Sequence, residues 1–207
     1  MSYLKRDFKK YIQQMDFKDY SIIDSPWSYN DKPPHLFKNQ LSYSLWNDNY
    51  NDLKFIFDNI KCDYIFLWIT NSLLDVGFKV INDCSSIWKY KTCVTWNKLS
   101  KNKKLFYGLG NTFRNSTEQL LVLSKIKKPP LGLNLRTTIM ESCGDRTIKP
   151  KKFESELINI LNLNKNFKGC YLFCGKKILN LDIENVDILN ENEIEIYNEN
   201  NEIMFED

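Results

Sequence analysis

Asp24, Ser25, Pro26 and Trp27 form the tetrapeptide of this chain that is best suited to chemistry. They follow the apolar run 20–23, which predicts a buried β-strand that ends where the tetrapeptide begins. An acid, a proline-stiffened turn and a flat aromatic ring at the end of a strand can hold a planar heterocycle with an exocyclic amine. Asp24 and a main-chain carbonyl of the turn would accept hydrogen bonds from the amine, and the Trp27 indole would stack on the ring.

Strand-like and helix-like segments alternate around this tetrapeptide, which predicts an α/β domain. The run 63–70 is almost continuously apolar, as is typical of a central parallel strand covered on both faces. We expect one domain over residues 1–190 and an acidic tail over 191–207. Helices are predicted at 3–15, 53–60, 71–84 and 151–163, strands at 19–23, 63–70, 90–97, 118–125, 136–141 and 169–173, and an edge strand at 186–189.

The composition excludes several classes of protein. The chain has 207 residues, of which 43% are hydrophobic and 14% aromatic, too many for a disordered chain. No apolar stretch approaches the roughly 20 residues that span a bilayer, and the N-terminal residues lack the pattern of a secretory signal. We therefore expect an intracellular protein with no membrane partner.

Cysteine and histidine usage argues against a metal centre. The chain has six cysteines, none of them paired in the C-x2-C spacing of a zinc site, and His35 is its one histidine. We expect reduced core thiols, no metal, and no histidine-based catalytic triad.

The charges are segregated along the chain although the net charge is only +3. Lysines crowd 98–104, 125–128 and 149–152, and acids crowd the last residues. Basic loops beside an aromatic site are suited to bind the phosphate backbone of a nucleic acid. The alternative is that each lysine run is an ordinary solvated surface.

Six short segments occur in a fixed order along the chain. They are DSPW (24–27), FLWIT-N (66–71), TW-N-K (95–98), FRNSTEQLLV (113–122), KP (149–150) and YLFCG (171–175). The series resembles the MT-A70 family of S-adenosylmethionine-dependent adenine-N6 methyltransferases over roughly residues 7–190. The resemblance implies a Rossmann-like methyltransferase fold, with a central, mostly parallel sheet, helices on both faces, and a base motif that precedes the cofactor motif.

The resemblance also implies a role for each matching residue. The catalytic residues would be Asp24, Ser25, Pro26 and Trp27, with the Ser25 carbonyl as the second acceptor for the amine. The residues implied to bind S-adenosylmethionine are Asp7, Phe8, Asp24, Lys149, Phe173, Gly175, Lys176, Glu191 and Asn192. The residues implied to border the substrate are Ser28, Tyr29, Asn30, Lys98, Arg114 and Asn115.

The chain departs from the family pattern at two places. Ser25 stands where the family has proline; serine keeps the backbone carbonyl, so we expect a loss of stiffness of about 0.5–1 kcal/mol rather than lost chemistry. The family's glycine-arginine is represented by Gly175 and Lys176, and its later Gly-Asn-Gln aligns loosely with 190–192.

The function implied is N6-methylation of adenine in DNA or RNA by direct in-line methyl transfer, with the adenine single-stranded or flipped out of its helix. One alternative is an inactive subunit that acts as a nucleic-acid-binding scaffold for an active partner. Another is a methyltransferase for a different amine or a free nucleotide. Because the chain has little room for a target-recognition domain, we expect a homodimer or a heterodimer with a related subunit. The choice between DNA and RNA and the target sequence stay open.

Overall fold

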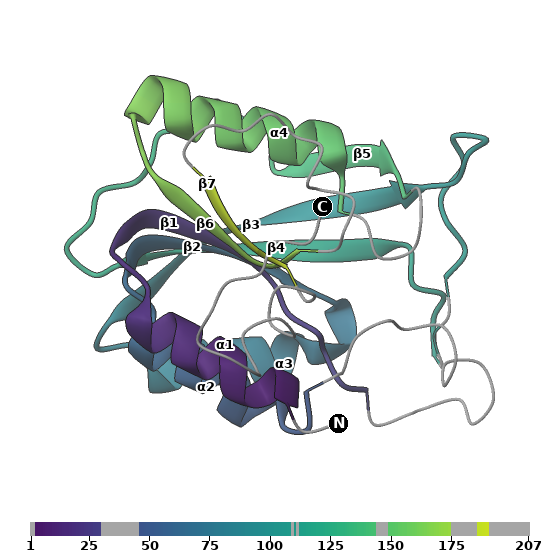
Figure 1. Cartoon of the computed structure of the whole chain (residues 1–207). Helices are drawn as coiled ribbons and strands as arrows, with labels where there is room; N and C mark the ends of the chain where they lie inside the picture. Colours follow the sequence, from purple (N-terminus) through teal and green to yellow (C-terminus); the bar gives the residue numbers. More distant parts are fainter. Residues whose placement is uncertain are drawn as a thin grey trace, which may run out of the picture.

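The computed structural model describes residues 3–29, 46–108, 110, 112–143, 149–174 and 186–190, with side chains except at 3–7, 174 and 186–190. Seven strands form one sheet in the order β5-β3-β4-β2-β1-β6-β7 (Figure 1). The strands are β1 Lys18–Asp24, β2 Cys62–Ile69, β3 Trp88–Leu99, β4 Thr117–Lys125, β5 Thr138–Ser142, β6 Gly169–Cys174 and β7 Val186–Asn190.

Strand direction makes the sheet mostly parallel, as predicted. β1 pairs in parallel with β2 and with β6, and the β6–β7 and β3–β5 pairs are also parallel. Only β4, among the described strands, runs against its neighbours β2 and β3. The expectation for the run 63–70 is therefore half right: β2 is central and buried, but it is parallel on one side and antiparallel on the other.

Helices cover both faces of the sheet (Figure 1). α1, α2 and α3 lie on one face and α4 on the other. The predicted helix 71–84 is divided into a 3₁₀ turn, η1, and α3, and the predicted helix 151–163 continues beyond α4 as a π-type turn, η2. None of the helices in the described ranges is both long and apolar enough to cross a membrane. The bounds are α1 Tyr3–Gln14, α2 Asn49–Asn59, η1 Asn71–Leu73, α3 Leu74–Asp83, α4 Lys151–Asn159 and η2 Ile160–Asn164.

The sheet separates two apolar cores. Because successive side chains of a strand point to opposite faces, β2 contributes to both. Ile65 and Leu67 pack with the α1–α3 side, whereas Phe66 and Trp68 pack with the α4 side. All eight residues of β2 are buried, which explains its nearly continuous apolar sequence.

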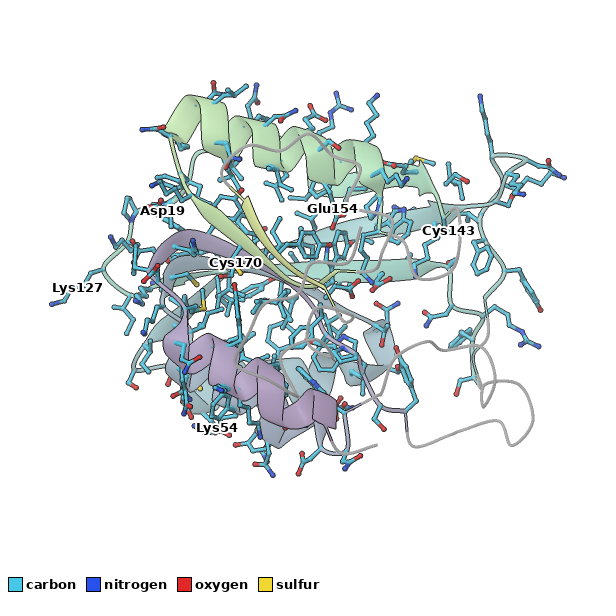
Figure 2. All side chains as sticks on the ribbon, viewed as in Figure 1. Asp19, Lys54, Lys127, Cys143, Glu154 and Cys170 are labelled. Carbon is cyan, nitrogen blue, oxygen red and sulfur yellow. The ribbon has the colours of Figure 1, made fainter. Side chains whose placement is uncertain are left out.

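One end of the sheet gathers the segments that carry the candidate site. β1, β2, β3 and β6 all end there, and β4 begins there, because β4 alone is antiparallel. We call this the carboxyl end of the sheet. In Figure 2, Cys143, which directly follows β5, lies towards this end, and Lys127, which follows β4, lies at the opposite end. Ligands of open α/β sheets bind outside the carboxyl ends of their strands.

Candidate active site

Two carboxylates and two ammonium groups meet at the carboxyl end of the sheet. The Nζ atom of Lys149 lies 2.8 Å from Oδ1 of Asp24 and 2.7 Å from Oε1 of Glu118. The Nζ atom of Lys98 lies 2.7 Å from Oε2 of the same Glu118. The four residues come from the end of β1, the start of β4, the end of β3 and the residues before α4, so the fold alone brings them together. We call them the charged cluster.

The two carboxylates of the charged cluster differ in acidity. Burial alone would raise the pKa of Glu118, but Lys149 and Lys98 hold that pKa at about 2. Burial raises the pKa of Asp24 to about 6, and the negative charge of Glu118 adds to this rise against the opposing effect of Lys149. Burial alone would lower the pKa of Lys149, but Asp24 and Glu118 raise it above its ordinary value. Asp24 is therefore the member that titrates closest to neutral pH.

A pair of buried indoles lies beneath the two ammonium groups. Lys149 Nζ is 5.8 Å from the ring centroid of Trp68, and Lys98 Nζ is 4.9 Å from that of Trp96. The two rings contact each other edge-on, with their centroids 6.1 Å apart. Both cations are thus within the distance at which the face of an indole attracts positive charge.

Glu154 lies under this layer and is a functional candidate that the sequence reasoning missed. One of its oxygens, Oε1, accepts hydrogen bonds from Trp68 Nε1 at 2.8 Å and from the Tyr171 hydroxyl at 2.6 Å. Its other oxygen is buried without a hydrogen-bond partner. Burial raises the pKa of Glu154 to about 8 in spite of the two donors. Figure 2 shows Glu154 between α4 and the sheet.

The tetrapeptide itself is a tight turn fixed to the start of α2. The Ser25 carbonyl accepts a hydrogen bond from Trp27 N at 2.8 Å, and the Pro26 carbonyl accepts one from Trp46 N at 2.9 Å. Ser28 exchanges two hydrogen bonds with the Asn49 side chain, of 2.9 and 2.6 Å. The backbone at the end of β1 is therefore held in place, as a preorganised site requires.

The expected role of Trp27 is wrong in this structure. Its side chain is only 4% exposed, its Nε1 donates to the Trp68 carbonyl at 3.2 Å, and its ring contacts Trp46 edge-on at 5.2 Å. The indole is thus part of the core under the turn and offers no open face to a base. Tyr29, two residues further along, is an exposed aromatic residue, with 39% of its surface accessible. Its hydroxyl group is the buried part and bonds to the Thr70 side chain. Burial of this hydroxyl raises the pKa of Tyr29, and the negative charge of Glu118 adds a smaller rise.

Two residues expected to bind the cofactor, Phe8 and Phe173, have side chains in the core. Phe8 is 1% exposed and Phe173 is 4% exposed, and their centroids lie 5.4 Å apart. Their rings therefore offer no open face, and their role in binding the cofactor stays a prediction. The backbone of Phe173 is unusual instead, because its φ of 62° lies in the left-handed region that strains a side chain such as Phe. This strained backbone is next to β1, since Leu172 pairs with Ile23.

The remaining predicted residues fall into three groups. Arg114 and Asn115 lie outside the charged cluster: Arg114 is exposed and donates from Nε to the Tyr107 hydroxyl at 3.2 Å, and Asn115 approaches Asn71 at 3.5 Å. Asp7 belongs to α1, but its side chain is not described. Asn30, Gly175, Lys176, Glu191 and Asn192 lie outside the described residues, and their roles stay predictions.

Sequence signals existed for the two acids that were not assigned a role. Glu118 is the first acid after a run from 84 to 117 without any, and it lies at the start of a buried strand. Glu154 occupies a position of α4 on the same face as the buried Leu157 and Ile158. An acid at a core position of an amphipathic helix indicates a partnered, special role.

Comparison with known proteins identifies the family. A model of the MT-A70 family matches residues 19–161, which include all four members of the charged cluster. No curated protein matches the chain significantly. The mostly parallel sheet with helices on both faces agrees with the Rossmann-like methyltransferase fold that the sequence predicts. The family match implies a methyltransferase that uses S-adenosylmethionine. This chain belongs to the MT-A70 family.

Proposed function

We propose that this protein transfers a methyl group from S-adenosylmethionine to N6 of adenine in DNA or RNA. The observation that carries the proposal is the Asp24 carboxylate, which lies at the end of β1, 2.8 Å from Lys149, inside the region that matches the family. The end of β6 lies beside it in the same sheet. An acceptor for the amine and a strand end suited to a cofactor are thereby neighbours.

Asp24 is suited to activate a weak nucleophile. The lone pair of the adenine amine is delocalised into the ring, and accepting its N–H bonds draws the nitrogen towards a pyramidal geometry. Lys149 holds Oδ1 of Asp24, so Oδ2 is the oxygen that would accept from the amine. The Ser25 carbonyl keeps a second lone pair beside its bond to Trp27 N and would accept the other N–H. Both acceptors would also stabilise the positive charge that develops on nitrogen. The sulfur would keep the electron pair of the broken carbon–sulfur bond and leave as a neutral thioether, and the methylated nitrogen would release one proton.

The cluster residues fit the charges of the proposed cofactor. S-adenosylmethionine, when bound, supplies a methyl group carried on a positively charged sulfur. Its amino-acid end has a carboxylate and an ammonium group, which match the ammonium of Lys149 and the carboxylates of Asp24 and Glu118. We assign these residues to binding and orientation, and Tyr29 to covering the base in the place that Trp27 does not fill.

Replacing Asp24 by asparagine tests this function. Asp24→Asn keeps the size of the side chain but removes its charge, so we expect methylation of adenine-containing oligonucleotides to fall by about 100-fold or more. Asp63→Asn is the matched control, because Asp63 is also a buried acid paired with lysine, 2.6 Å from Lys128, at the opposite end of the sheet. Mass spectrometry of DNA and RNA after incubation with labelled cofactor measures both. A wild-type chain that labels no adenine-containing nucleic acid, alone or with a partner subunit, contradicts the proposal.

A second candidate function is a subunit that supports an active partner without catalysing transfer. Two observations favour it: Lys149 already occupies one oxygen of Asp24, and the Trp27 indole is buried. Calorimetry with S-adenosylmethionine separates the two, since a chain that binds no cofactor is the supporting subunit. Pairing with a second subunit is part of both proposals, and gel filtration tests it.

A further inference from the structure

We propose that the connection between β3 and β4, residues 100–116, binds the single-stranded nucleic acid that flanks the target base. Tyr107 and Phe113 stack on its bases, and the cations of the connection contact its phosphates. This inference rests on the proposed function and gives the substrate strand a path on the molecule. The structure describes the whole connection except residues 109 and 111.

Large apolar side chains are exposed along this connection. Leu105 is 61% exposed, Tyr107 is 76% exposed and Phe113 is 85% exposed, the highest value among the large hydrophobic side chains that the structure describes. The three residues lie within nine positions of one connection, and large apolar side chains left exposed together are typical of a binding surface. Two of them are aromatic, and a flat ring can stack on any nucleobase.

The charge of the connection favours an anionic partner. Between Ser100 and Thr117 the sequence has four cations and no acid; the cations are Lys101, Lys103, Lys104 and Arg114. All four side chains are exposed. Arg114 also lies over the ring of Tyr107, with its guanidinium carbon 5.1 Å from the ring centroid. Lysine is depleted at protein–protein interfaces, whereas cations interleaved with aromatic rings are typical of single-strand binding.

The backbone joins this surface directly to the charged cluster. Lys98 N donates to the Ser116 carbonyl at 2.8 Å, and Phe106 N donates to the Lys98 carbonyl at 2.8 Å. Gly108 N continues the pairing with the Asn115 carbonyl at 3.1 Å. Figure 1 shows the connection beyond the end of the sheet where β3 ends and β4 begins. A strand whose adenine reaches Asp24 would therefore pass over this surface.

Binding of labelled oligonucleotides to the full chain tests the inference without requiring methyl transfer. We expect fluorescence anisotropy to show binding of single-stranded DNA or RNA, weakened about fivefold or more by Tyr107→Ala and by Phe113→Ala. Phe17→Ala is the matched control: Phe17 is 53% exposed and pairs with Lys125 at 5.6 Å, but at the opposite end of the sheet. Replacing the four cations by alanine should lower the slope of log affinity against log salt by about 0.7 for each phosphate that the chain no longer neutralises.

Three results would overturn the inference. They are a wild-type chain that binds no single strand, equal weakening by Phe17→Ala, and variants of Tyr107 and Phe113 that bind normally. In the last case, a changed oligomeric state on gel filtration would identify the surface as a protein interface instead. A chain that binds strands through this surface but never methylates them refutes the proposed function alone. A chain that methylates while both variants bind normally refutes this inference alone.

Discussion

Lys149 links two carboxylates that would otherwise repel each other at the carboxyl end of the sheet. It lies 2.8 Å from Asp24 and 2.7 Å from Glu118, and Glu118 has a second cation in Lys98. Because Glu118 has two positive partners and Asp24 has one, Glu118 is the stronger acid and the structural anchor. Asp24 is left with a pKa of about 6, close enough to neutral pH for its charge to be adjustable.

The pKa of Asp24 predicts how methylation depends on pH. Protonation of Asp24 below about pH 6 removes its charge and turns one carboxylate oxygen into a donor, so the carboxyl group no longer accepts strongly from the amine. We expect kcat/KM to fall about tenfold per pH unit below about pH 6 and to level off above it. Initial rates from pH 5 to 8 with saturating cofactor measure this. The residual activity of Asp24→Asn should not show this fall below about pH 6. If the kcat/KM of the wild-type chain does not change over a pH range where the chain stays folded, Asp24 is not the acceptor.

Because Lys149 contacts two carboxylates and Lys98 contacts one, we expect the two lysines of the charged cluster to contribute unequally to the unfolding free energy. Lys149→Met leaves Asp24 without its cation and the buried Glu118 with one, so we expect unfolding free energy to fall by about 3 kcal/mol. Lys98→Met removes the less buried lysine and leaves Glu118 paired with Lys149, so a loss of about 1 kcal/mol is expected. Urea denaturation of the two variants measures the difference. Equal losses would show that Lys149 does not link the carboxylates in solution.

At the scale of the elements, α4 positions two groups of the site from one helix start. Pro150, directly before the helix, offers no capping side chain, but Glu141 of β5 accepts from Lys152 N at 2.9 Å and from Phe153 N at 3.2 Å. This cap from a neighbouring strand satisfies free N–H groups of the first turn and fixes the helix against the sheet. Lys149, which precedes Pro150, is thereby directed to the charged cluster.

Glu154, in the first turn of the same helix, predicts a pH-dependent stability. Its pKa is raised from 4.5 to about 8, so between these values the folded chain holds a proton that the unfolded chain has lost. The stability that this proton contributes is fully present below about pH 4.5 and is lost as pH rises to about 8, at roughly 1 kcal/mol per pH unit. Glu154→Gln is neutral throughout and still accepts from Trp68 and Tyr171. Urea denaturation at several pH values measures the unfolding free energy of both chains. The wild-type value minus the Glu154→Gln value should therefore decline from about pH 4.5 to about pH 8. A difference that does not change with pH would show that Glu154 is charged in the folded chain.

The elements could be predicted from sequence because each carries its own pattern. The apolar run of β2 and the spacing of Phe153, Leu157 and Leu161 in and after α4 depend on local burial, which the sequence displays. The direction of β4 could not be predicted, since an alternation of buried residues is the same in either direction. The burial of Trp27 could not be predicted either. A tryptophan that follows a strand can stack on a base or pack in the core, and its contact with Trp46 joins two residues that are far apart in the sequence.

At the scale of the whole molecule, the two ends of the sheet are built differently. The carboxyl end has the charged cluster, the exposed Tyr29 and the cationic connection 100–116. At the opposite end the buried Asp63 pairs with Lys128 and Lys125, whose side chains are partly exposed, so these ion pairs are ordinary in strength. Phe173, whose backbone is left-handed, also lies near the end of β6 at the carboxyl end. Ligand sites need polar side chains that are close together and held in position by rigid secondary structure, and the carboxyl end of the sheet has both.

This asymmetry predicts that S-adenosylmethionine stabilises the whole chain. A ligand that binds only the folded state at 100 times its Kd adds about 2.7 kcal/mol to the unfolding free energy. For a domain of this length we expect Tm to rise by about 5–10 °C. Differential scanning fluorimetry with and without the cofactor measures the shift; Asp63→Asn should keep it, since Asp63 lies at the far end of the sheet, and Asp24→Asn should reduce it. An unchanged Tm for the wild-type chain at saturating cofactor would favour the supporting subunit, because a catalyst of methyl transfer must bind the methyl donor and a scaffold need not.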